Sequence, residues 1–171
     1  MTGARGVLVE PNPQLASVLR RKRPRDTILQ CGVGVGEAKG ADYYMFDSHT
    51  LNTFSQSEAL RYSAMGEKQL GAIRIDLKNV NEILELVSHL DFINLDIEGL
   101  DLEILKGIDW DKYRPATLCV ETITYETEKE PEKLEGIHSY LSSLGYKVYA
   151  DTFINTIFLD GRIEGLWNRR Y

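Results

Sequence analysis

Hydrophobic and polar positions along the chain follow two periods. Short runs rich in β-branched residues predict strands, and the stretches between them, where apolar residues recur every three to four positions, predict amphipathic helices. The run Ala72–Lys78 alternates strictly, with isoleucine and leucine on one side and charged residues on the other, which predicts a strand with one solvated face. The predicted strands are Arg5–Glu10, Asp26–Val33, Ala41–Asp47, Ala72–Lys78, Asp91–Ile97, Ala116–Ile123, Tyr146–Asp151 and Thr156–Gly161.

Local sequence signals mark where the predicted helices begin and end. Asn12 is a candidate N-cap for a helix with Pro13 at its first position, and Asn79 is a candidate N-cap for a second helix. Gly107 ends a short helix that contains "LDLEILK", and Gly145 ends a helix in which leucines and an isoleucine form a stripe. The segment from Ser48 to Gly71 is polar and has no clear period, so it is predicted as a loop with a helical turn.

Strands that alternate with helices, followed by two strands only a few residues apart, predict the fold class. The pattern is typical of an α/β domain with a mainly parallel sheet that closes with an antiparallel C-terminal hairpin. At 171 residues the chain is predicted to form a single domain over residues 1–171.

Composition and charge exclude some functions. The net charge of −6 argues against a nucleic-acid partner. One basic cluster, "RRKRPR" at Arg20–Arg25, is compatible with a polyanion site. Because it falls at the end of a predicted helix, complementation of the helix dipole is the simpler interpretation. No stretch is apolar enough for a membrane span or a signal peptide, so we expect a cytoplasmic protein without a membrane partner.

Cysteine and histidine positions give no sign of a metal site. Cys31 and Cys119 lie far apart in apolar runs, as expected for small buried side chains in a reducing compartment. The three histidines have no ligand spacing with each other or with the cysteines, so no metal is predicted.

The glycines of "TILQCGVGVGEAKG" look like a nucleotide-binding loop. In a dinucleotide loop the glycines open a helix, and an acid ends the next strand about 20 residues later. Here "ADYYMFD", a β-rich run, follows Gly36 instead. The spacing therefore favours a turn between strands and disfavours a nicotinamide-dependent oxidoreductase.

Acidic residues end three of the predicted strands. Glu10 ends the first strand, Asp96 and Glu98 follow "INL", and Glu121 follows "TLCV". Ligands of open α/β sheets bind at the carboxyl ends of the strands. Although a single such acid is often a turn or cap residue, acids at three strand ends favour a binding site.

The motifs "GVLVEPNPQLASVL", "LNTFS", "DFINLDIEGLDLEILKG" and "NTIFLD" occur in an order that resembles the FkbM family of S-adenosylmethionine-dependent methyltransferases. The resemblance covers the chain from Gly6 to about Asp160. It implies a Rossmann-like class I methyltransferase sheet and S-adenosylmethionine as the cofactor. It also places the first strand and the glycine loop of the family before Arg5, where only Met1–Ala4 stand. We therefore expect an N-terminally truncated domain, with the edge left by the missing strand available for a homodimer.

The resemblance also assigns cofactor-binding residues. It implies that Glu10 accepts hydrogen bonds from the two ribose hydroxyls, with Asn12 beside it as a further cofactor-binding residue. Gly32 and Val33 match the loop near the adenine and are expected to contact it through their backbone. Asp96 matches an acid next to the transferring methyl group, where a carboxylate can hold the cofactor amine.

The resemblance also implies catalytic and substrate-binding residues. Asp96 and Glu98 are the candidate catalytic residues, with Glu98 facing the acceptor as a possible base. Glu121 is a candidate substrate-binding residue. The expected activity is methylation of a hydroxyl of a small molecule or sugar. The alternative is a non-catalytic remnant of a methyltransferase that serves as a dimerisation or docking module.

Overall fold

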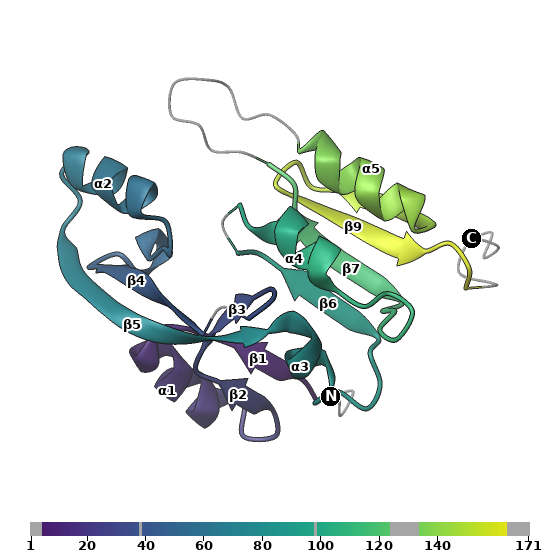
Figure 1. Ribbon diagram of the computed structural model, residues 1–171, viewed down its shortest axis with the longest axis horizontal. Coiled ribbons are helices and arrows are strands. Elements are labelled where there is room, and N and C mark those ends of the chain that lie inside the picture. Colours follow the sequence, from purple (N-terminus) through teal and green to yellow (C-terminus); the bar gives the residue numbers. More distant parts are fainter. Residues whose placement is uncertain (1–4, 38, 98, 124–133, 164–171) are drawn as a thin grey trace. The chain divides into compact units, whose positions relative to one another are not determined.

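The computed structural model describes residues 5–37, 39–97, 99–123 and 134–163 (Figure 1). Within these residues the chain forms a mixed α/β structure with five α-helices, one 3₁₀ helix and nine strands. The chain divides into two compact units, Met1–Val87 and Ser88–Tyr171.

The first unit begins with a parallel strand pair joined by a helix. Strand β1 (Val7–Val9) pairs with β2 (Thr27–Leu29), and helix α1 (Pro13–Lys22) connects them. The Oδ1 atom of Asn12 accepts the backbone N–H groups of Gln14 and Leu15 at 2.9 and 3.3 Å, and Pro13 occupies the first turn. The predicted cap of α1 is confirmed.

A second sheet of this unit has the order β3-β5-β4. Strand β3 (Gly32–Gly34) runs parallel to β5 (Gln69–Asn79), and β4 (Gly40–Phe46) runs antiparallel to β5. Gly36, at φ 65°, lies between β3 and β4, and no helix occurs among the described residues there. The glycine-rich stretch is therefore no helix-opening nucleotide loop. Only Gly36 lies in the turn, because two of its glycines belong to β3.

Gly32 is required by close packing. A Cβ atom on Gly32 would lie 2.5 Å from Leu77 Cδ2 and 2.8 Å from Phe54 Cζ, whereas a Cβ on Gly34 would meet Leu77 at no less than 3.4 Å. Phe54 also packs against Tyr43, with their ring centroids 4.7 Å apart. The side chains of Leu77 and Phe54 thus leave no room for a larger residue at position 32.

We expect Gly32→Ala to lower the free energy of unfolding by about 1–3 kcal/mol, the usual cost of overpacking. Gly34→Ala, in the same strand, is the matched control and should stay within about 1 kcal/mol of the wild type. Urea denaturation of both variants provides the measurement. Equal effects of the two substitutions would contradict the packing assigned to Gly32.

The segment Ser48–Gly71 differs from its prediction as a loop with one helical turn. It holds a 3₁₀ helix (η1, His49–Leu51), helix α2 (Gln56–Ala64) and the start of β5. The prediction missed α2 because only Ala59 of the helix is buried, so the sequence has no apolar stripe. Ser55 begins α2, and its Oγ accepts the backbone N–H of Glu58 at 3.3 Å.

Helix α3 (Val80–Leu84) ends the long strand β5. The Oδ1 atom of Asn79 accepts the N–H of Asn81 at 2.9 Å, which confirms the predicted cap. The apolar residues Val80, Ile83, Leu84 and Val87 recur at helical spacing, but α3 ends at Leu84, so Val87 lies outside it.

The second unit is a four-stranded sheet of order β6-β7-β9-β8 with two helices. Strands β6 (Phe92–Leu95) and β7 (Thr117–Glu121) are parallel, whereas β9 (Asn155–Asp160) runs antiparallel to both β7 and β8 (Tyr146–Asp151). Helix α4 (Asp101–Gly107) follows β6, and α5 (Glu135–Ser143) precedes β8 (Figure 1). The predicted C-terminal hairpin is confirmed. The fully buried side chains of its core include Leu105, Leu118, Val120, Leu141 and Phe158.

Three of the strand pairings are parallel (β1–β2, β3–β5, β6–β7), and three are antiparallel (β4–β5, β7–β9, β8–β9). These pairings belong to three sheets. The α/β class was therefore predicted correctly, but the expected predominance of parallel pairing is not found. The reason is that β4 returns along β5 and β9 inserts between β7 and β8.

Candidate functional site

The carboxyl end of β1 carries Glu10 and Asn12. The backbone N–H of Glu10 donates to Leu29 O of β2 at 3.0 Å, which extends the parallel ladder to the strand end. The Oε1 atom of Glu10 accepts the N–H of Asn12 at 2.8 Å. The carboxylate is thus held at the start of α1 through one oxygen, and no partner of its other oxygen lies in the described part of the chain.

Asn12 is completely buried, and only half of its amide is used. Its Oδ1 caps α1, but its Nδ2 has no hydrogen-bond partner among the described residues. A buried unpaired donor costs about 1–3 kcal/mol, and such groups normally have a partner. The end of β1 therefore combines a carboxylate with a buried amide donor that pairs with no described residue. A ligand hydroxyl, which can both donate and accept, matches this pair.

Gly32 and Val33, the residues expected near the adenine, lie in β3. Their pairing with Leu77 and Lys78 of β5 engages one edge of the strand. Among the described strands β3 has no other neighbour, so a ligand would meet their backbone at the opposite edge. Gly32 is buried under Phe54, whereas Val33 is half-buried.

In the second unit, polar residues stand abreast where β6 and β7 end. The register pairs Leu95 with Val120, so the next residues, Asp96 and Glu121, lie side by side on the same face of the sheet. Glu121 in turn pairs with Asn155 of β9. Asp96 is exposed. Burial is the main cause that raises the pKa of the Cys119 thiol, and the negative charge of Asp96 raises it further.

Asn155 was not among the residues predicted for the site. It opens the motif "NTIF", which carried part of the family resemblance, and this was the available signal in the sequence. Its position beside Glu121 depends on the antiparallel register of β7 and β9, which the sequence does not reveal.

A buried hydroxyl pair fixes the strand end that carries Glu121. Thr122 and Thr156 are both completely buried, and their Oγ1 atoms lie 2.7 Å apart. Thr156 Oγ1 also lies 3.4 Å from His138 Nε2 of α5. These contacts link the end of β7 to the start of β9 and to α5.

Glu98 lies outside the described residues, and its catalytic role stays a prediction. The residues on either side of it are held by Asp101, whose carboxylate accepts the N–H groups of Ile97 and Gly99 at 3.4 and 3.3 Å. Gly99 has φ 90°, a conformation that favours glycine. Asp101 is only 2% exposed, so its carboxylate is a buried acceptor that holds the loop before α4.

Burial raises the pKa of Asp101, although backbone N–H groups oppose the shift. A carboxyl whose pKa is higher in the folded than in the unfolded state stabilises the fold below its unfolded pKa, and this stability is lost as pH rises through the folded pKa. We therefore expect the stability of the wild type relative to Asp101→Asn to fall as pH rises above about 4, the pKa of an unfolded aspartate, and through the higher folded pKa. The Asp101→Asn variant also lacks one acceptor oxygen, and this loss changes the stability difference between the two proteins by the same amount at every pH. Chemical denaturation across this range provides the test, and a constant difference would contradict it.

The two cysteines are free, with Cys31 buried and Cys119 half-buried. Burial is the main cause that raises the pKa of both thiols. Within the described residues, no helix has the length and apolar character needed to span a bilayer.

The described residues thus form an α/β protein with acids at the carboxyl ends of parallel strands, and beside one of these acids is a buried amide that no described residue pairs with. The family described as "Methyltransferase FkbM domain" matches residues 1–148, most of the chain. The chain belongs to this methyltransferase family. Comparison with curated proteins gives no match. Comparison with solved structures gives none either.

Proposed function

We propose that the chain uses S-adenosylmethionine as methyl donor and methylates a hydroxyl of a small molecule or sugar. The observation that carries the proposal is the end of β1, where a carboxylate held through one oxygen lies next to a buried amide donor that has no partner among the described residues. Two vicinal ribose hydroxyls would supply the donors and acceptors that this pair lacks. Membership in a methyltransferase family supports a methyl donor as the ligand.

In the proposed site, different residues would bind different parts of the cofactor. Glu10 would accept hydrogen bonds from the ribose hydroxyls, and Asn12 Nδ2 would donate to one hydroxyl oxygen. Gly32 and Val33 would contact the adenine through their backbone. Asp96, exposed at the end of β6, would hold the cofactor amine by a charge-assisted hydrogen bond.

Bound S-adenosylmethionine supplies a methyl group on a good leaving group, so the protein contributes positioning, exclusion of water and, for a hydroxyl acceptor, a base. Glu98 is the proposed base and would receive the hydroxyl proton on its carboxylate. Glu121 and Asn155, paired across β7 and β9, would position the acceptor. A carboxylate accepts from a hydroxyl and an amide donates to one, so the pair suits a polyhydroxylated acceptor.

The proposed fold is a Rossmann-like class I methyltransferase sheet. The parallel pair β1–β2 and the order β6-β7-β9-β8, with β9 antiparallel, support this arrangement. We also propose a cytoplasmic location, which two free cysteines support. Among the described strands β1 pairs only with β2, and its other edge is the proposed contact for a homodimer.

Calorimetric titration of S-adenosylmethionine, and of its demethylated product, into the 171-residue chain tests the proposed function. Binding with a dissociation constant on the order of micromolar, about −8 kcal/mol, is the expected result. No heat of binding at ligand concentrations of about 1 mM would overturn the proposal. The alternative of a non-catalytic docking module is not favoured by the family match, and it would gain support only from that second outcome.

A further inference from the structure

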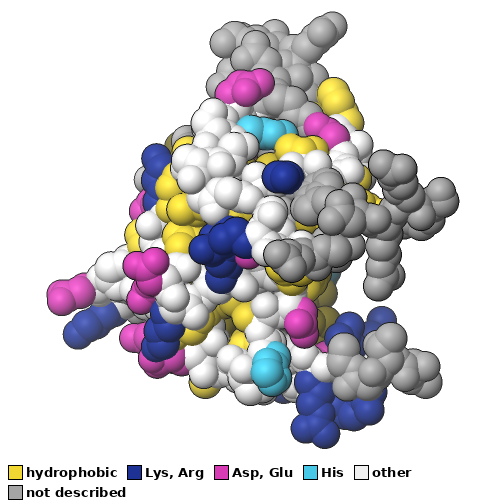
Figure 2. Space-filling model, turned by 90° about the vertical axis from the view of Figure 1, so that its right-hand side faces the viewer, with side chains coloured by type: hydrophobic (Ala, Val, Ile, Leu, Met, Phe, Trp, Pro, Cys, Tyr) yellow, Lys and Arg dark blue, Asp and Glu magenta, His cyan; other side chains and the backbone are white. Residues whose placement is uncertain are grey.

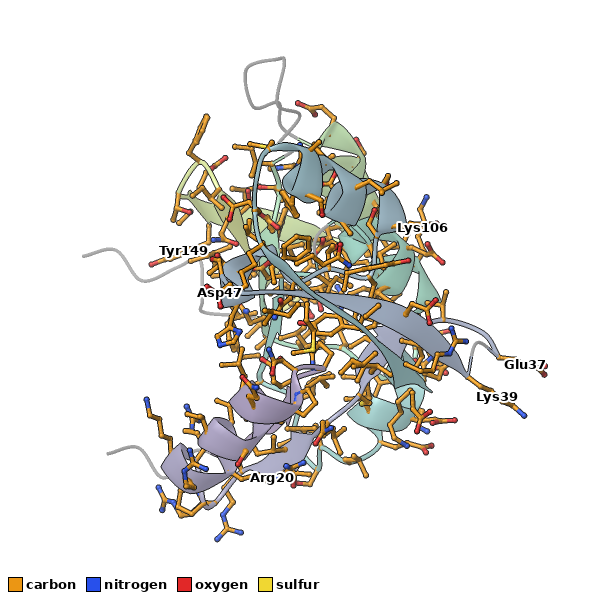
Figure 3. The ribbon with its side chains drawn as sticks, turned by 90° about the vertical axis from the view of Figure 1, so that its left-hand side faces the viewer. Arg20, Glu37, Lys39, Asp47, Lys106 and Tyr149 are labelled. Atoms are coloured by element: carbon orange, nitrogen blue, oxygen red, sulfur yellow. The ribbon has the colours of Figure 1, made fainter. Side chains whose placement is uncertain are left out.

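The outer end of α1 carries a dense group of cations. Arg20, Arg21 and Lys22 occupy the last turn, and Arg23 and Arg25 follow in the turn that leads to β2. All five are exposed. Figure 3 labels Arg20 at this end of the helix, and Figure 2 shows Lys and Arg side chains gathered at its lower right.

The tertiary structure adds a sixth cation. Asp26 Oδ2 accepts from Arg23 Nε at 2.5 Å, and its Oδ1 accepts the backbone N–H of Gly6 at 3.0 Å. The hydrogen bond from Gly6, followed by Arg23, lowers the pKa of Asp26. Arg5, exposed and adjacent to Gly6, is thereby joined to the cluster. We call Arg5, Arg20, Arg21, Lys22, Arg23 and Arg25 the basic patch.

The patch is more cationic than the fold requires. A helix C-terminus carries about half a negative charge, which one or two cations complement. In the described part of the chain Arg21 has Ser17 as a partner, at 3.0 Å, and Arg23 has Asp26, but Arg20, Lys22 and Arg25 have no hydrogen bond or ion pair. The patch with Asp26 carries +5, so the rest of the chain carries −11 against the total of −6. The cations of the patch therefore repel one another, and binding of an external anion would relieve this repulsion.

We propose that the basic patch docks the protein onto an anionic lipid surface. Clusters of four to eight Lys and Arg bind anionic lipids with about 1 kcal/mol for each cation, and six cations fall in this range. The net negative charge does not prevent this contact, because salt screens charges more than about 8–10 Å away. The cytoplasmic leaflet carries such a surface.

The composition of the patch disfavours other occupants. Single-stranded nucleic acids are held by aromatic side chains between cations, and protein interfaces centre on aromatic or aliphatic anchors. Among the described residues the first large exposed hydrophobic side chain along the chain is Leu60, and none occurs between Arg5 and Arg25. A compact group of cations without such anchors is the kind of surface that binds the diffuse negative charge of lipid headgroups.

The patch and the proposed cofactor residues lie at opposite ends of α1. Asn12 caps the start of the helix, whereas the patch surrounds its end, ten residues or about 15 Å away. Docking through the patch would therefore not involve the start of α1, where Glu10 and Asn12 lie. The inference does not depend on the proposed function, since lipid binding and cofactor binding would use separate residues.

The test is cosedimentation of the chain with phosphatidylcholine vesicles that contain about one-third phosphatidylserine. We expect binding at low salt, release at about 0.5 M salt, and no binding to vesicles of phosphatidylcholine alone. The variant R20Q/K22Q/R25Q removes three cations that form no hydrogen bond or ion pair with a described residue and keeps the Arg23–Asp26 contact, so the fold is expected to be retained. Its affinity should fall about fivefold per cation, or on the order of a hundredfold.

The matched control is K39Q/K68Q/K106Q, which changes the net charge equally at exposed lysines outside the patch (Lys39 and Lys106 are labelled in Figure 3). It should bind the vesicles about as well as the wild type. An equal loss in both variants would mean that only net charge matters, and would overturn the proposal. So would absent vesicle binding, or tighter binding to a short DNA duplex than to the vesicles at the same salt concentration.

Discussion

Replacing Glu10 with glutamine is expected to weaken the binding of S-adenosylmethionine on the order of a hundredfold. The substitution removes the charge from both proposed hydrogen bonds to the ribose, and bonds to charged groups contribute about 1.5–3 kcal/mol each. A total loss of about 3 kcal/mol corresponds to this factor. The glutamine Oε1 can still accept the N–H of Asn12, so the start of α1 should stay intact.

Calorimetric titration of the variant against the wild type gives the measurement. Glu67→Gln, at an exposed position of the same unit, is the control for the loss of one negative charge and should leave the affinity within about twofold. If the wild type binds and Glu10→Gln binds equally well, Glu10 does not belong to the cofactor site. If neither binds, the proposed function itself fails, which is a separate outcome.

Replacing Arg114 with methionine is expected to lower the free energy of unfolding by about 3–5 kcal/mol. Its Nε and Nη2 donate to the two oxygens of Asp160 at 2.7 and 2.8 Å, and Nη2 also donates to Leu144 O at 2.8 Å. The guanidinium lies 4.6 Å from the ring centroid of Tyr146. The Asp160 side chain is only 7% exposed, and without Arg114 its carboxylate keeps, among the described residues, the backbone N–H of Arg162 at 3.0 Å and the exposed Arg162 guanidinium at 3.6 Å.

Urea denaturation followed by tryptophan fluorescence suits this measurement, since Trp110 contacts the ring of Tyr146. Arg74→Met is the matched control. Arg74 pairs with Asp42 at 3.1 Å, but both side chains are more than half exposed, so its loss should cost less than about 1 kcal/mol. Similar costs for the two substitutions would contradict the role assigned to the buried pair.

The basic patch shows how a local interpretation changes once neighbouring segments are known. Read along the sequence, Arg20–Arg25 is the end of a helix, and the dipole accounts for part of its charge. Asp26, through its bond to Gly6, brings the segment of Arg5 to the same place. The net charge of the chain, an average over all residues, could not show this local concentration.

Much of the secondary structure was predictable because its signals are local. Asn12 and Asn79 cap their helices through backbone groups two or three residues away, and Gly145 ends α5 with φ 86°. Alternation identified β5, and the absence of a helical stripe after Gly36 ruled out a nucleotide loop. The family, too, was recognisable from motifs in the sequence.

Contacts between distant segments were decided only by the tertiary structure. Helix α2 has a single buried residue and so leaves no apolar stripe to detect. Gly32 needs its hydrogen side chain because Phe54 and Leu77 meet there. The row of Asp96, Glu121 and Asn155 depends on strand register, and the burial of Asp101 and Asp160 depends on what packs over them. The sequence by itself determined most of the strands and helices and which acids end the strands, since these follow from residues a few positions apart, but it did not show that Asp26–Val33 divides into β2 and β3 of two different sheets. Pairing, register and burial arise between residues far apart in the chain, and they decided which side chains stand together.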